Sequence, residues 1–420
     1  IIQNSLNNTK NMKKNRVVIT GMGVISPIGN NLNDFWNNLK KGFNGIDQIT
    51  LFNTDKFDVK IAGESSVDLN LFFDRKELNK LDRFSCFAIL AADQAIKQSE
   101  IMNSNTSSDR IGVIVGSGIG GISTFESQHK KLLKNPRFVS PFFIPSMISD
   151  IAAGHISIKY GFKGINYGVV SACATSNHAF GDAFKMIQSD LADIVVSGGS
   201  EAAITEMSIA GFSNMKALSK NSDKNSASRP FDKKRDGFVM GEGAGILVLE
   251  NLEHAKKRGA NIIGEIIGYG ATADAYHITT PHPDGEGAEK AIINAIADAN
   301  IDINKIQYIN AHGTSTPYND RIETKAIKNI FKENASDLYV SSTKSMTGHL
   351  LGAAGGIEAI ASLLSISNNY IPPTINYNNF DSDCDLNYVP NTGIEKDINY
   401  ALSNSFGFGG HNSVVIFKGA

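Results

Sequence analysis

The stretch Val169-Val170-Ser171-Ala172-Cys173-Ala174-Thr175-Ser176 places a single cysteine where an apolar, β-branched run gives way to a helical pattern. We predict a strand over residues 165–171 and a helix from about Cys173 to Gln188. The unpaired N–H groups at a helix N-terminus stabilise a thiolate and can hold an oxyanion. Cys173 is therefore predicted to be a nucleophile with a lowered pKa, and a buried structural cysteine is the alternative.

Two histidines lie in equally small, turn-rich frames far along the chain. His312 belongs to residues 310–317 (NAHGTSTP), and His349 ends residues 344–349 (KSMTGH). Each adjoins a glycine near the end of a predicted strand, which is where sites built on sheets gather. A nucleophile and its imidazole partners meet in space rather than in sequence. We therefore expect a thiol nucleophile with two imidazole partners, and Lys344 is placed to tune the charge of a nearby imidazole.

The composition of the chain limits the classes of protein to which it can belong. The chain has 420 residues, of which 41% are apolar and 20% are charged, and its formal net charge is −2. These values are typical of a globular enzyme and argue against a nucleic-acid partner. No apolar stretch approaches the roughly 20 residues that span a membrane. The three cysteines form no CxxC pair and no HExxH motif occurs, so we expect neither a disulfide framework nor a metal site.

Predicted strands and helices alternate along the chain, which indicates an α/β architecture with buried sheets. Further strands are expected over residues 16–20, 111–115, 193–197, 245–249, 261–269, 306–310, 338–342 and 413–417, and helices over 83–97, 252–258, 287–299 and 351–364. A seam near residues 253–260 divides the chain into two α/β halves, residues 16–256 and 257–420. Residues 1–15, rich in Asn and Lys, have too few apolar side chains to fold alone and are expected to form a disordered extension, the remnant of a targeting segment.

One glycine-rich motif favours a different class of enzyme. Residues 116–121 (GSGIGG) follow a predicted strand and match GxGxxG, the fingerprint of a dinucleotide-binding loop. That fingerprint also requires an acidic residue about 20 positions further on, and residues 136–141 contain none. An NAD-dependent oxidoreductase is therefore a weak alternative.

Several lysines recur at the spacing of a helical turn. Lys76 and Lys80 are four residues apart, and Lys216 begins a second series with the same spacing. Such charges usually form a solvated face. The functional alternative is that these lysines bind an acidic carrier protein.

Six short segments together resemble one enzyme family. They are residues 171–176 (SACATS), 229–232 (RPFD), 236–243 (DGFVMGEG), 311–316 (AHGTST), 344–349 (KSMTGH) and 404–410 (NSFGFGG). On these segments the chain, over roughly residues 16–418, resembles the β-ketoacyl-acyl carrier protein synthases of the elongating I/II type. The resemblance implies a thiolase-like α/β fold, with two related halves in a five-layered α-β-α-β-α arrangement, and a homodimer.

The resemblance also implies a reaction. Cys173 would accept an acyl chain as a thioester, while His312 and His349 would polarise a malonyl thioester and stabilise the enolate left by decarboxylation. Attack of this carbanion on the acyl-cysteine would give a 3-oxoacyl product in fatty-acid elongation, with acyl carrier protein as the partner. The N–H groups of Cys173 and Phe408 would hold the oxyanion, and Phe408 would gate the acyl pocket.

Supporting roles follow from the same resemblance. Lys344, paired with Glu358, would support the histidine geometry, and Thr314 and Thr316 would bind the phosphopantetheine arm. No organic cofactor would be needed, because positioned N–H donors hold the negative charge that carbon dioxide leaves behind.

The motifs leave alternatives open. A polyketide-type ketosynthase shares them, whereas a partner subunit that only shapes a dimer pocket has little need of Cys173 and both histidines. A biosynthetic thiolase usually has a second cysteine near its C-terminus, and residues 407–410 contain none. His411, where many bacterial members have threonine, and the abundance of Asn and Lys indicate a plastid-type organelle. A cytoplasmic location is the alternative.

Overall fold

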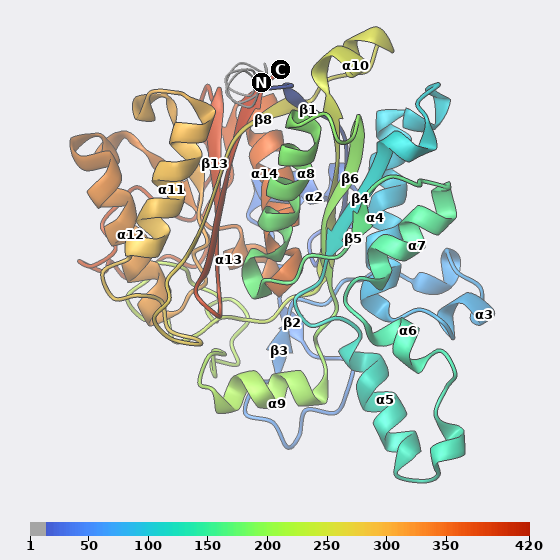
Figure 1. The fold of residues 1–420 in the computed structure, drawn as a ribbon. Helices are drawn as coiled ribbons and strands as arrows, with labels where there is room; N and C mark the ends of the chain where they lie inside the picture. Colours follow the sequence, from blue (N-terminus) through green and yellow to red (C-terminus); the bar gives the residue numbers. More distant parts are fainter. Residues whose placement is uncertain (1–13) are drawn as a thin grey trace.

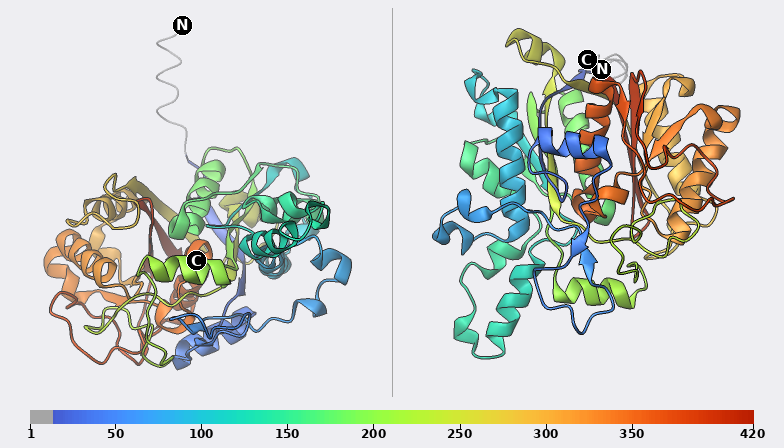
Figure 2. Two further views of the ribbon diagram at one scale, coloured as in Figure 1. Left: turned by 90° about the horizontal axis from the view of Figure 1, so that it is seen from below. Right: turned by 180° about the vertical axis from the view of Figure 1, so that it is seen from behind.

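Two central helices lie between two sheets in the computed structural model, which describes residues 14–420. Residues 1–13 of the extension predicted for residues 1–15 therefore lie outside the described residues. The central helices are α8 (Thr175–Gln188) and α14 (Ala354–Asn368), and outer helices cover the far side of each sheet (Figure 1). The outer helices are α4 (Arg83–Ser99) and α7 (Ile151–Tyr160) on one sheet, and α11 (Glu286–Ala299) and α12 (Pro317–Phe331) on the other. The view from behind shows the same order of layers (Figure 2), and the predicted five-layered arrangement is confirmed.

Each half of the molecule contributes five strands to a ten-stranded sheet. They are β1 (Val17–Ile25), β4 (Ile111–Gly116), β5 (Asn166–Tyr167), β6 (Ile194–Glu201) and β7 (Gly243–Asn251) in the first half, and β8 (Gly264–Ala273), β9 (Tyr308–Asn310), β10 (Tyr339–Ser341), β13 (Tyr400–Gly407) and β14 (His411–Gly419) in the second. The predicted division after residue 256 falls between β7 and β8.

The two halves share one strand topology. The strand order is β1-β7-β6-β4-β5 in the first half and β8-β14-β13-β9-β10 in the second. In chain order this is first, fifth, fourth, second and third in both halves. The first two of these pairings are antiparallel and the last two are parallel in both halves. This identity of topology relates the halves, although the sequence shows no repeat between them.

The two sheets meet at β1. This strand pairs along its length with β7 and, over Val17–Ile19 only, with β8. The ten strands therefore form one hydrogen-bonded sheet, whose two parts lie on either side of α8 and α14 (Figure 1).

Several strands are buried at consecutive positions, without alternation, as expected for sheets covered on both faces. All of β1 and all of β6 are buried. Helix α14 is also buried on nearly every side, because it lies between the two sheets. It approaches β7 so closely that a Cβ on Gly245 would lie 2.2 Å from the carbonyl carbon of Gly356, so only glycine fits there.

The strand predicted over residues 165–171 is largely wrong. Only Asn166–Tyr167 (β5) pair with β4. The chain leaves the sheet at Gly168, where a Cβ would lie 2.7 Å from the Cα of Asp150. A 3-10 turn over Ala172–Ala174 comes next, so helix α8 begins at Thr175 rather than near Cys173.

The other predicted strands and helices are present, with shifted ends. The sequence patterns do not predict α2 (Leu32–Lys41), α5 (Ile122–Leu132), α7, α9 (Glu206–Asn214), α12 and β13. Within the described residues, no helix is both long and apolar enough to cross a membrane.

Candidate active site

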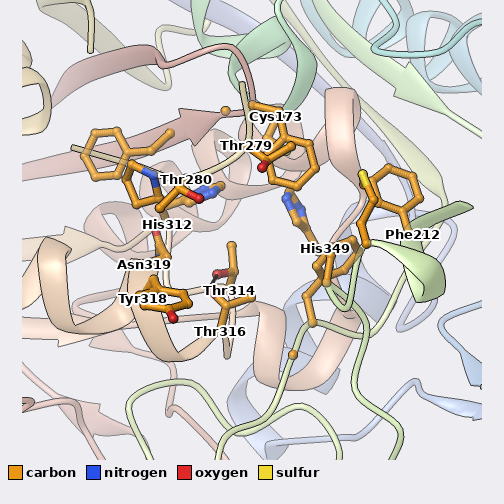
Figure 3. Close-up of a pocket in the computed structure, with 18 of the residues that line it drawn as sticks. Cys173, Phe212, Thr279, Thr280, His312, Thr314, Thr316, Tyr318, Asn319 and His349 are labelled. Carbon is orange, nitrogen blue, oxygen red and sulfur yellow. Dashed lines mark hydrogen bonds between the residues drawn. The ribbon is translucent and has the colours of Figure 1, made fainter. Parts of the chain in front are cut away.

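One cavity of about 400 Å³ gathers most of the residues singled out in the sequence. Those that line it are Cys173, Lys216, His312, Thr314, Thr316, His349 and Phe408. The close-up shows the cysteine, both imidazoles and both threonines around the same space (Figure 3). Lys344 and Glu358 are buried and do not line the cavity, and neither do Lys76 and Lys80.

A strained turn presents Cys173 to the cavity. Ala172 has a φ of +50°, a left-handed value that is unfavourable for a residue with a side chain. Thr175 holds the turn, because its hydroxyl accepts a hydrogen bond from the N–H of Ser171 (3.0 Å) and donates one to the carbonyl of Ala172 (2.7 Å). The thiol is thereby fixed just before α8 begins.

The end of β13 lies against this turn. A Cβ on Gly407 would lie 3.1 Å from the backbone nitrogen of Cys173, so glycine permits the close approach of the two backbones. The backbone N–H of Phe408, the next residue, acts to lower the pKa of the Cys173 thiol. The Phe408 ring packs against Phe212 of α9, with ring centroids 6.2 Å apart. The backbone at the end of β13 therefore lies beside Cys173, although the two segments are far apart in the sequence.

A buried carboxylate fixes the loop that carries His312. Glu323 of α12 accepts hydrogen bonds from the N–H groups of His312 and Gly313, both at 2.8 Å, and from the side-chain amide of Asn404 at 2.9 Å. Burial raises the pKa of Glu323 to about 6, although these donors oppose the rise. The position of the His312 imidazole is therefore set by its backbone.

Hydrogen bonds on three sides hold His349. Its N–H donates to the carbonyl of Val239 (2.7 Å), and its carbonyl accepts from the N–H of Gly241 (2.9 Å). Its Nδ1 accepts from the N–H of Leu351 at 3.3 Å, so Nε2 carries the proton of the neutral ring. Nε2 is buried and has no hydrogen-bond partner in the described part of the chain. The ring therefore presents a free N–H donor.

The two imidazoles are adjacent and neutral. Their ring centroids are 5.3 Å apart and the rings are nearly perpendicular. Burial lowers the pKa of His312 and of His349 well below the ordinary value, and Lys344 lowers both further. Lys344 Nζ bonds Glu358 Oε1 at 2.5 Å, and both side chains are only 1% exposed. Glu358 thus holds the positive charge of Lys344 close to the imidazoles.

The predicted low pKa of the Cys173 thiol is wrong. Burial raises this pKa to about 12, against the opposing effects of Lys344 and of the Phe408 N–H. The helix dipole lowers the pKa of the thiol less than expected, because α8 begins two residues after the cysteine. The resting thiol is therefore protonated, and its proton must leave when the sulfur reacts.

A protein carboxylate occupies the glycine-rich loop that resembles a dinucleotide fingerprint. Glu201, the last residue of β6, accepts hydrogen bonds from the Ser117 hydroxyl (2.7 Å) and from the N–H groups of Gly118 (2.8 Å), Ile119 (3.2 Å) and Gly352 (3.0 Å). A dinucleotide-binding fold offers such N–H groups to a pyrophosphate. Here they already bind a side chain of the same protein, so this loop lacks free donors for a dinucleotide.

The three lysines do not share one helical face. Helix α3 spans only Arg75–Leu78, so Lys80 lies beyond its end, with its Nζ 5.2 Å from the ring centroid of Phe142. Lys216 follows α9 with a left-handed φ of +57°. Of the three, Lys216 alone lines the cavity.

Sequence patterns do not single out three charged residues that build this site, namely Glu201, Glu323 and Arg235. Arg235 is buried and pairs with Asp381 at 2.5 Å. It also donates to the carbonyls of Thr316 (3.2 Å) and Pro317 (3.1 Å), at the start of α12. Its place between the 229–232 and 236–243 segments is the one sequence signal that points to it.

Other ligand chemistry is sparse in residues 14–420. No group of three or more His, Cys, Asp or Glu side chains in that range is arranged to hold a metal ion. Cys86 and Cys384 are buried free thiols, and burial raises the pKa of each to about 12. Neither of these two cysteines lines the cavity, whereas Cys173 does.

Comparison with known proteins places the chain among characterised families. The family described as "Beta-ketoacyl synthase, N-terminal domain" matches residues 14–255, and "Beta-ketoacyl synthase, C-terminal domain" matches residues 263–378. The chain is 56% identical over 405 residues to 3-oxoacyl-[acyl-carrier-protein] synthase 2 of Staphylococcus aureus, with 96% of this chain and 98% of the relative covered. It is 51% identical over 411 residues to the protein of the same name from Synechocystis sp., with 97% and 99% covered.

Solved structures agree with these matches. A ketosynthase described in complex with its type II polyketide acyl-carrier protein and bound to a hexaketide is 36% identical, with a TM-score of 0.91 over 97% of this chain and 100% of that chain. A beta-ketoacyl synthase from Burkholderia phymatum is 33% identical, with a TM-score of 0.90 and the same coverage. The chain therefore belongs to the β-ketoacyl synthase family.

Proposed function

We propose that this chain catalyses the decarboxylative condensation of an acyl group, held on Cys173, with malonyl-acyl carrier protein in type II fatty-acid elongation. The products are 3-oxoacyl-acyl carrier protein, carbon dioxide and free acyl carrier protein. The observation that carries the proposal is the cavity in which one thiol faces two adjacent neutral imidazoles. The names of the 56% and 51% identical relatives support the same reaction.

The first step is thioester exchange. The Cys173 sulfur attacks the carbonyl carbon of the incoming acyl thioester, and the N–H groups of Cys173 and Phe408 hold the oxyanion that forms. Two positioned donors of this kind each contribute about 3 kcal/mol to the transition state. The bond from the carbonyl carbon to the pantetheine sulfur then breaks. The proton of the Cys173 thiol ends on that leaving sulfur, which balances the step.

The second step forms the new carbon–carbon bond. Malonyl thioester loses carbon dioxide, and its electron pair moves onto the thioester, whose carbonyl oxygen accepts hydrogen bonds from His312 and His349. Neutral rings suit this role, because each can donate an N–H hydrogen bond to the carbonyl oxygen without a change in its own charge. The resulting carbon nucleophile attacks the acyl-Cys173 thioester. The attack gives a tetrahedral intermediate. Its collapse releases the 3-oxoacyl product and the Cys173 thiolate, and the thiolate then takes up a proton.

Two hydroxyls line the same cavity and suit a pantetheine arm. Thr314 and Thr316 lie with their Oγ1 atoms 2.9 Å apart, within hydrogen-bond distance of each other. Hydroxyls can donate to and accept from the amides of the arm. We assign these two threonines to substrate binding. We assign to Lys344, which is paired with Glu358, the role of supporting the two imidazoles.

The experiment that tests the function is a condensation assay with purified acyl carrier proteins. Mixing the enzyme with acyl- and malonyl-acyl carrier protein should give a 3-oxoacyl chain two carbons longer and one carbon dioxide per turnover. A second candidate, a polyketide-type ketosynthase, is favoured by the 36% identical structure. It predicts repeated condensation without reduction, so a chain extended several times in the same assay would favour that candidate.

The carrier protein is proposed to dock beside the cavity mouth, with Lys216 as a contact and with Lys76 and Lys80 further out. Lys216→Glu should raise the KM for acyl-acyl carrier protein about threefold to tenfold, because it places a negative charge opposite an acidic partner. The effect should shrink at high salt. Reaction of Cys173 with a small free thioester should be unchanged.

Lys220→Glu is the matched control for Lys216→Glu, because Lys220 bonds Asp58 on the surface and does not line the cavity. Equal losses with the carrier protein and with the small thioester would contradict the assignment of Lys216. An equal rise in KM from both variants would show a general charge effect instead.

A homodimer is proposed across the free edge of strand β5. This strand ends the ten-stranded sheet, and an open edge offers unpaired backbone groups to another strand. Ile158 of α7, a helix that packs on β5, is 79% exposed, and Val170 just after β5 is 58% exposed. Sedimentation should give twice the chain mass of 45.2 kDa, and a monomer at every concentration tested would refute the dimer.

A plastid-type organelle is the proposed location, and the cytoplasm is the alternative. The support is the abundance of asparagine and lysine and the histidine at position 411. Imaging of the tagged precursor in its own cell would distinguish the two locations.

A further inference from the structure

We propose that Glu201 is a positioning residue for His349 and that it couples this imidazole to the apolar cluster around Cys173. The inference rests on the proposed function, in which His349 assists decarboxylation. Glu201 is completely buried, and its four hydrogen-bond donors, described above, are all neutral groups. A buried carboxylate held only by neutral donors from distant loops joins those loops firmly, because each unmet donor or acceptor would be costly.

One oxygen of Glu201 bridges two loops that are far apart in sequence. Oε2 accepts from the N–H of Gly118 at 2.8 Å and from the N–H of Gly352 at 3.0 Å. The loops also touch directly, since a Cβ on Gly352 would lie 2.4 Å from the nitrogen of Gly118. Neither loop can shift without breaking a bond to this carboxylate.

The Gly352 loop leads directly to His349. The residue before Gly352 is Leu351, whose N–H donates to His349 Nδ1 at 3.3 Å. Leu351 has a φ of +47°, a left-handed value that only its surroundings can maintain. If Gly352 moved, the preceding peptide would turn and the Nδ1 atom would lose its donor. The proton would then no longer be confined to Nε2, the atom that donates to the substrate carbonyl in the proposed function.

The Gly118 loop leads to the apolar cluster around Cys173. Its next residue, Ile119, packs in the same apolar cluster as Leu351, Cys173 and Phe238. Each of the two loops joined by Glu201 thus contributes one apolar side chain to the cluster that contains the nucleophile. A change in one loop is therefore transmitted through the carboxylate to the other, and from there to His349.

Glu201→Gln tests the proposal with little change in size. The amide keeps one acceptor oxygen, but its NH₂ group faces N–H donors and loses at least one of the bridging bonds. The expected result is a mixed tautomer at His349, read from the ¹⁵N shifts of the labelled imidazole in the intact protein. The kcat for decarboxylation of malonyl-acyl carrier protein should fall about 10- to 100-fold, with KM little changed. Acylation of Cys173 should fall less.

Glu250→Gln is the matched control. Glu250 is also fully buried and accepts from Thr20, His254 and Arg258. It lies at the opposite end of β7 from Gly243, the residue that pairs with Glu201. The control should lose stability while the His349 tautomer and the kcat for decarboxylation stay as in the wild type.

An unchanged tautomer and an unchanged kcat in Glu201→Gln would overturn the proposal, as would changes equal to those of the control. If Glu201→Gln does not fold, Ser117→Ala removes one donor and keeps the carboxylate. It should shift the tautomer in the same direction by a smaller amount, and no shift would be decisive against the proposal. If the wild type fails to decarboxylate its substrate, the proposed function fails, but the tautomer measurement still decides the role of Glu201.

Discussion

Replacing His349 with alanine is expected to lower the condensation rate by a factor of about 10² to 10³, while Cys173 still accepts its acyl group. The reason is the unpartnered Nε2–H of this ring, which is placed to stabilise charge that develops only during decarboxylation. Removing such a donor raises the barrier of that step and leaves the thioester exchange at Cys173 intact. Single-turnover measurements of each half-reaction would separate the two.

His312→Ala should have a similar effect, because its ring lies 5.3 Å from that of His349 in the same cavity. If both rings serve one carbonyl oxygen, the double variant should lose less than the product of the two single losses. His129→Ala is the control, because His129 is exposed on α5 and does not line the cavity. A condensation rate that is insensitive to both active-site histidines would contradict the mechanism.

Lys344→Ala is expected to destabilise the protein by about 3–5 kcal/mol, because it leaves Glu358 as an unpaired buried charge. Burial already raises the pKa of Glu358, and Lys344 opposes that rise. Without the lysine, the folded-state pKa of Glu358 lies further above its unfolded value. The folded protein then takes up a proton, so the deficit in the free energy of unfolding should shrink as the pH falls. Urea unfolding at several pH values measures this.

The same substitution should change the pH dependence of catalysis. Lys344 lowers the pKa of both active-site histidines, so in Lys344→Ala these pKa values rise towards the ordinary value. The decarboxylation rate of the variant should then fall as the pH drops through that value, where the wild-type rate stays flat. Lys344→Met combined with Glu358→Leu should recover stability but not the wild-type pH profile. Parallel profiles in wild type and variant would refute an electrostatic role for Lys344.

The parts of this fold that the sequence predicts well are those with a strong local pattern. The buried strand β4 reads as a continuous apolar run, and the alternation of strands and helices predicts the layered α/β architecture. The strand over residues 165–171 fails for a reason that is not local. Val169 and Val170 have strand-like side chains, but the packing of Gly168 against Asp150 takes the chain out of the sheet.

The site divides in the same way. Cys173, His312 and His349 can be predicted as candidates because each lies in a small, turn-rich segment, and the structure places them in one cavity. The thiol pKa could not be predicted, because burial outweighs the helix terminus and burial depends on the whole fold. Glu201 and Glu323 have no sequence signal, because most of their partners are backbone N–H groups and the side-chain partner of each is distant in the sequence.

The most direct test of the account is intact-protein mass spectrometry of the wild type and of Cys173→Ala, each mixed with acyl-acyl carrier protein. The account predicts a mass increase of one acyl group on the wild type, none on the variant, and discharge of the adduct when malonyl-acyl carrier protein is added. No adduct on the wild type, or an equal adduct on Cys173→Ala, would contradict the assignment of Cys173 as the nucleophile.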